Sequence, residues 1–247
     1  MPNKLTDKSI KAYSKALVKV MEELEAEVLA FMVGAGTTTP AAAAAVLNSR
    51  PEFIKFLNDS GYNDLSRAYI KQYEKMPGAV ELAFNKRLLP PPVFSTVSAE
   101  TFAGLAQMDL QNFSSIGTKA MDDLRMGIYR NTVAGANFKD TVNLIKASTV
   151  GLDGKGSALA NHSYTHANTA ILNFQGEVVQ KAGESIGFDG DDSLWELVHV
   201  MDAATRDICV DAYTDPVRTR AEWLAIDYFG GSPGGYNCRG ILYPYIN

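Results

Sequence analysis

The sequence has no run of apolar residues close to the roughly 18 that a membrane-spanning helix needs. Its Lys-rich start also lacks a hydrophobic signal core and a cleavage site. We therefore expect no membrane insertion, and we expect the chain to be assembled in a reducing cytosol. An excess of positive charge is missing too, since the net charge is −5 and the pI is near 5.3. This balance argues against a surface dedicated to nucleic acid and leaves only a local DNA contact open.

Residues suited to catalysis or metal binding are few, with two cysteines and three histidines in 247 residues. His162 and His166 have the spacing of a His-Glu-x-x-His zinc site, but Ser163 stands where that site needs its Glu. The acidic turn 189–192 lacks the EF-hand pattern, and the glycine-rich segment 151–157 lacks the spacing of a phosphate loop. We therefore expect no enzyme, no cofactor and no metal; a metal-dependent enzyme using the two histidines and the acidic turn is the enzymatic alternative.

Helical periodicity is what the sequence does have. With 46% hydrophobic residues and a mean hydropathy of −0.09, the chain can bury one substantial core or two smaller ones. Apolar residues recur every three or four positions over 10–28, which predicts an amphipathic helix capped by Thr6 and ending near Gly34. Thr39 is the expected cap of an Ala-rich helix over 41–48.

Three consecutive prolines predict a connector over 90–97, because they remove backbone donors and fix an extended conformation. Ser98 is expected to start a second helical group, with interruptions at Gly117 and Gly135. A further helix is expected over 158–182.

The sequence changes character after 183. Aromatic and β-branched residues predict a strand over Leu194–Met201, and Ile241–Pro244 is expected to pair with it. A short helix is expected over 220–225. The predicted fold is mainly α, a helical body with a small C-terminal α/β knot that contains a short sheet. The predicted regions are an N-terminal helical region (1–89), a Pro-rich connector (90–97), a helical body (98–182) and a Cys-containing α/β module (183–247).

Two segments in that module, 195–209 and 233–240, have the most specific pattern in the chain. They resemble the C-terminal module of the phage head morphogenesis family, the Mu F-like minor head proteins. The resemblance covers roughly 113–244, about half the chain, and is specific only in the final third. The positions that match the family pattern are the aromatic strand residue Trp195, then Asp202, Thr205, Cys209, Pro233, Cys238 and Arg239.

The sequence departs from the family pattern at other positions of the same motif. Two of the family's metal-capable ligands are left, Cys209 and Cys238, whereas a structural zinc site needs four. The resemblance leaves these two cysteines either as a disulfide or as packed thiols. It also implies that Asp202 and Thr205 form a turn and that Arg239 pairs with an acid. The departures are Arg206, Gly235, Tyr236 and Gly240.

The resemblance implies a structural virion protein of a tailed phage, assembled in the host cytoplasm. Its expected role is that of a minor head or portal-associated protein acting in head assembly or DNA delivery. Its expected partners are the portal or other capsid and tail proteins, and a homo-oligomer stays open. A head-to-tail connector or tail adaptor ring protein is the alternative from the same resemblance.

Overall fold

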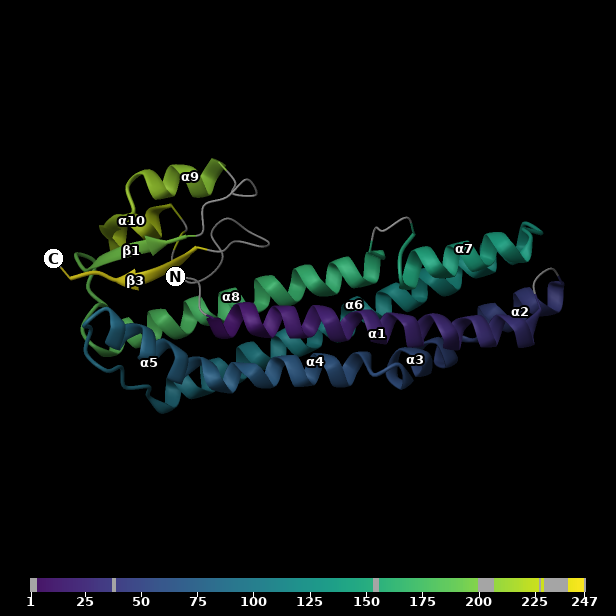
Figure 1. The fold of residues 1–247 in the computed structure, drawn as a ribbon, viewed down its shortest axis with the longest axis horizontal. Helices are drawn as coiled ribbons and strands as arrows, with labels where there is room; N and C mark the ends of the chain where they lie inside the picture. The colour runs from purple at the N-terminus through teal and green to yellow at the C-terminus, as the bar shows by residue number, and fades with distance from the viewer. Residues whose placement is uncertain are drawn as a thin grey trace. The chain divides into compact units, whose positions relative to one another are not determined.

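The structure is a computed structural model that describes residues 4–36, 39–152, 156–199, 207–226, 228 and 240–246, without the side chains of Lys4, Ile208 and Cys209. It is mainly helical, with one small antiparallel sheet (Figure 1), as predicted for the fold class. In chain order the elements are α1 (Lys4–Ala35), α2 (Pro40–Asn48), α3 (Arg50–Asp59), α4 (Tyr62–Ile70), η1 (Lys71–Lys75), α5 (Met76–Lys86), α6 (Thr96–Val133), α7 (Phe138–Thr149), α8 (Ala158–Ser185), β1 (Leu194–Val198), α9 (Asp207–Thr214), β2 (Val217–Thr219), α10 (Arg220–Ala225) and β3 (Ile241–Pro244).

The chain forms two compact units, each made of stretches that are separate in the sequence. We call one the helical unit, formed by Lys11–Tyr69 and Leu110–Tyr164. We call the other the sheet unit, formed by Met1–Ile10, Ile70–Asp109 and Thr165–Asn247. The long helices α1, α6 and α8 therefore contribute residues to both units. The four regions predicted along the chain are a different division and stay a prediction.

Aromatic rings fill the core of the helical unit. The ring of Tyr13 in α1 lies 4.8 Å from that of Tyr69 and 5.6 Å from that of Phe113, measured between centroids. All three rings are buried, as expected for the apolar stripe of α1. Thr39 accepts a hydrogen bond from the backbone N–H of Ala42, which confirms it as the N-cap of α2.

The predicted interruption at Gly117 is wrong, because α6 runs through this position without a break. A Cβ at Gly117 would stand 2.7 Å from a ring carbon of Tyr62 and 2.8 Å from a methyl carbon of Leu57. The glycine therefore allows close packing inside the helical unit. The interruption at Gly135 is confirmed, since that residue has a φ of 68° and follows the end of α6.

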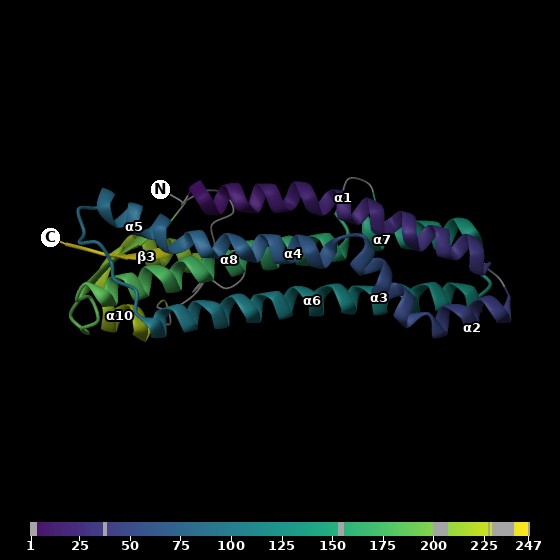
Figure 2. The ribbon, with the colours of Figure 1, turned by 90° about the horizontal axis from the view of Figure 1, so that it is seen from below.

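The sheet has the order β2-β1-β3, with both pairs antiparallel. The predicted pairing of β1 with β3 is confirmed, and its register sets Trp195 opposite Pro244 and Val198 opposite Ile241. Side chains alternate along β1, so that Trp195 and Leu197 are buried and their neighbours are half-buried. β3 lies beside the end of α8 in this unit (Figure 2).

Within the described ranges, no helix combines the length and the apolar character needed to cross a membrane.

Candidate functional site

Trp195 is the residue of the predicted motif whose side chain the structure describes. It lies in β1 and is fully buried, as expected for an aromatic strand residue. Cys209 belongs to α9, but its side chain lies outside the described residues. The predicted turn, the cysteine pair and the arginine stay predictions, because their residues also lie outside the described ranges: Asp202, Thr205, Pro233, Cys238 and Arg239.

Trp195 fixes the sheet against α8. A Cβ at Gly183 in α8 would stand 2.4 Å from Cη2 of Trp195 and 2.9 Å from Cγ of Pro244. The indole ring therefore lies directly on the helix backbone. On the sheet itself, the indole N–H of Trp223 in α10 donates to the main-chain oxygen of Trp195 at 2.9 Å. Two buried tryptophans thus hold β1 between α8 and α10.

A buried polar chain gives the sheet a second attachment. The hydroxyl of Thr6 donates to Oε1 of Gln175 at 2.8 Å, and Nε2 of Gln175 donates to the hydroxyl of Tyr243 at 3.3 Å. All three residues are buried, so each hydrogen bond satisfies a group that water does not reach. Thr6 was expected to cap its helix, but α1 already begins at Lys4, and the hydroxyl makes this tertiary contact instead.

An ion pair between Arg87 and Glu196 adds to this attachment. Nη1 of Arg87 lies 2.7 Å from Oε2 of Glu196 in β1, and the Arg87 guanidinium lies 4.6 Å above the ring of Tyr243. Burial raises the pKa of the Tyr243 hydroxyl, and the hydrogen bond from Gln175 and the charge of Arg87 oppose that rise. The Tyr243 hydroxyl therefore stays neutral at physiological pH. The Tyr243 ring lies under the Arg87 guanidinium, and its hydroxyl oxygen accepts a hydrogen bond from Gln175.

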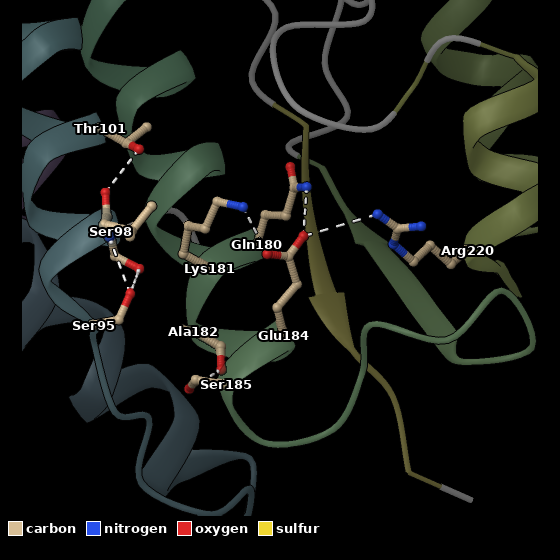
Figure 3. A network of polar contacts seen from close by, with 10 residues as sticks. Ser95, Ser98, Thr101, Gln180, Lys181, Ala182, Glu184, Ser185 and Arg220 are labelled. Atoms are coloured by element: carbon tan, nitrogen blue, oxygen red, sulfur yellow. Dashed lines mark hydrogen bonds and ion pairs between the residues drawn. The ribbon is translucent and has the colours of Figure 1, made fainter.

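A polar network surrounds the end of α8 (Figure 3). The Glu184 carboxylate accepts from Lys181 at 2.7 Å and from Gln180 at 2.9 Å, and the Arg220 guanidinium lies 3.9 Å away. Burial acts to raise the pKa of Glu184, but these donors and charges together hold it below its usual value. Arg220 also lies 3.6 Å from Asp191 of the acidic turn. The acidic turn is therefore tied to α10 and α8.

The sheet unit holds one half-buried acid beside a histidine. The hydroxyl of Tyr73 donates to Oδ2 of Asp109 at 2.9 Å, and Nε2 of His166 lies 3.9 Å from Oδ1 and 3.3 Å from the main-chain oxygen of the same residue. Burial raises the pKa of the Asp109 carboxyl, although the hydrogen bond from Tyr73 and the charge of His166 oppose the rise. This cluster was not predicted from the sequence.

The other residues considered for a metal site are not brought together. His162 is exposed on α8, whereas His166 is half-buried against Asp109. In the part of the chain that the structure describes, no three His, Cys, Asp or Glu side chains form a group able to hold a metal ion.

The helical unit contains a buried hydroxyl pair and a surface depression. The hydroxyls of Tyr62 and Ser163 lie 2.8 Å apart, and burial raises the pKa of Tyr62 to about 12. The depression has a volume of about 440 Å³ and lies between α2 and the end of α6. Its wall includes the exposed apolar side chains of Leu47 and Val133.

No family model, curated protein or solved structure matches the chain. In the sheet unit, the described residues attach a small α/β module to helices through aromatic packing, buried hydrogen bonds and ion pairs.

Proposed function

We propose that the protein is a structural component of a tailed-phage virion, a minor head or portal-associated protein that acts in head assembly or DNA delivery. The resemblance of segments 195–209 and 233–240 to the phage head morphogenesis family supports this proposal. The observation that best supports a structural role is the seating of Trp195 on the bare backbone of Gly183. A module fixed in this way suits rigid docking to other proteins.

The attachment residues support the same role. The polar groups of these residues bind one another: Arg87 pairs with Glu196 and lies over the ring of Tyr243, and Gln175 donates to the Tyr243 hydroxyl. Buried and paired polar groups rigidify a fold when all members have partners. In this proposal the sheet unit keeps the C-terminal module in one orientation while its outer surface contacts the portal or another capsid protein.

Purified particles of the phage that encodes this chain test the proposal. Quantitative mass spectrometry is expected to find the chain in particles with packaged DNA, at a few copies per portal ring. Deleting its gene is expected to leave particles that are defective in assembly or in DNA delivery. Absence of the chain from particles, with unchanged infectivity after deletion, would contradict the proposal.

The same measurement separates the two virion roles. A copy number equal to a full symmetric ring at the portal axis would favour the head-to-tail connector or tail adaptor alternative. A map of the intact particle that locates the chain would then identify the surface in contact with the portal.

A further inference from the structure

The part of α1 in the helical unit carries an ordered stripe of charge. The stripe consists of five residues at intervals of four, three, four and three positions: Lys11, Lys15, Val18, Glu22 and Glu25. This alternation keeps side chains on one line along a helix, as in helices that pair with another helix. Val18 is 57% exposed, and Lys11, Lys15 and Glu22 are exposed as well. The stripe faces solvent.

The charges on this stripe do not pair within the chain as far as it is described. Lys11, Lys15 and Glu22 are exposed and Glu25 is half-buried, and none of the four has an ion-pair partner among the described residues. Lys11 and Lys15 are four positions apart, and Glu22 and Glu25 are three apart, so like charges repel each other along the helix. The stripe therefore does not stabilise α1 itself.

We propose that this stripe, Lys11–Glu25, is a self-association surface on which the α1 helices of two copies pack antiparallel about a two-fold axis near Val18. The charges are arranged with opposite signs on either side of Val18. Reversing one helix therefore sets Lys15 opposite Glu22 of the second copy and Lys11 opposite Glu25 of the second copy. The two exposed valines then meet at the axis, and each ion pair occurs twice, as a two-fold interface requires.

The charge order favours this partner over others. A parallel pair in register sets Lys15 against Lys15 and Glu22 against Glu22, which repel. A polyanion such as DNA would bind the two lysines but meet two carboxylates on the same stripe. Only a partner with the reverse order of charges satisfies the whole stripe, and a second copy in antiparallel orientation has that order. The pairing does not depend on where the protein acts.

Charge reversal in the full chain tests the proposal. Sedimentation at rising concentration is expected to show a mass approaching that of two 26.8 kDa chains. Lys15→Glu or Glu22→Lys alone sets like charges opposite each other and is expected to weaken association at least about tenfold. The double variant Lys15→Glu/Glu22→Lys restores opposite charges and is expected to recover most of it. Because these positions are about 10.5 Å apart along one helix, the recovery reports a contact between chains.

Glu23→Lys is the matched control, because it makes the same charge change one position away and off the stripe. It is expected to associate as the wild type does. Val18→Cys supplies an independent readout, a disulfide between copies that Ala12→Cys, off the axis, does not form. A wild type that stays monomeric, single reversals that associate normally, or a double reversal that stays dissociated would each overturn the proposal.

Discussion

The six-membered edge of the Trp195 indole lies so close to Gly183 that an added Cβ would stand 2.4 Å from it. Real Cβ atoms do not approach a ring this closely, so any side chain at Gly183 forces the sheet and α8 apart. We expect Gly183→Ala to lower the free energy of unfolding by about 1–3 kcal/mol, measured by urea denaturation.

Gly104→Ala is the control for this change. Gly104 is also inside a long helix, α6, but an added Cβ there meets nothing within 4 Å. Alanine is the better helix former, so this variant is expected to be more stable by about 0.5–1 kcal/mol. Equal effects of the two substitutions would show that the indole contact does not matter to stability.

The hydroxyl of Tyr243 is expected to contribute through Gln175. Tyr243→Phe keeps the ring under the Arg87 guanidinium but removes the acceptor for Nε2 of Gln175. A buried amide without its partner costs about 1–3 kcal/mol, which thermal unfolding can measure. Tyr245→Phe, two positions further on, makes the same chemical change at a hydroxyl with no hydrogen bond among the described residues, and is expected to stay within about 0.5 kcal/mol of the wild type.

Asp109 is expected to make stability depend on pH. Its pKa is raised in the folded state by burial, so the folded protein binds the proton more readily than the unfolded chain. Its contribution to stability is fully present below the unfolded pKa, about 3.9, and is lost as the pH rises through the folded pKa. Lowering the pH from neutral should therefore stabilise the wild type relative to Asp109→Asn.

Urea denaturation of both proteins at several pH values measures this difference. Asn at this position still offers an oxygen to the hydroxyl of Tyr73, so the variant removes the titration while keeping an acceptor. A difference between the two proteins that is constant with pH would contradict the expected linkage.

Packing at Gly117 gives a prediction for the helical unit. Gly117→Ala would bring a methyl group to 2.7 Å from the ring of Tyr62, which also bonds to Ser163 through its hydroxyl. We expect a loss of about 1–3 kcal/mol in the free energy of unfolding. A variant as stable as Gly104→Ala would show that Tyr62 can move without cost.

Local sequence patterns were sufficient to predict most of the long helices and the pairing of two strands. The predicted helix over 158–182 corresponds to Ala158–Ser185, and the predicted pairing of β1 with β3 is confirmed. Periodicity and turn residues specify these elements, because both act over a few positions. β2 was not predicted, since its three residues are too short to show an alternating pattern.

The attachment of the module was harder to predict. Arg87 and Glu196 are 109 positions apart, and nothing in the residues around either one indicates the other. The helix break predicted at Gly117 is wrong for the same reason. Glycine usually weakens a helix, and the packing that favours glycine here comes from Tyr62, which is far away in the chain. Trp195, in contrast, could be placed in a buried strand from its own neighbours.

The bond between Thr6 and Gln175 bridges 169 positions of chain. The sheet unit therefore cannot be cut out as one continuous fragment, because a piece beginning after α6 would lack both Thr6 and Arg87. Closing so long a loop costs conformational entropy, and contacts between residues far apart in the chain form slowly. The first turns of α1 gain this contact only when α8 is in place.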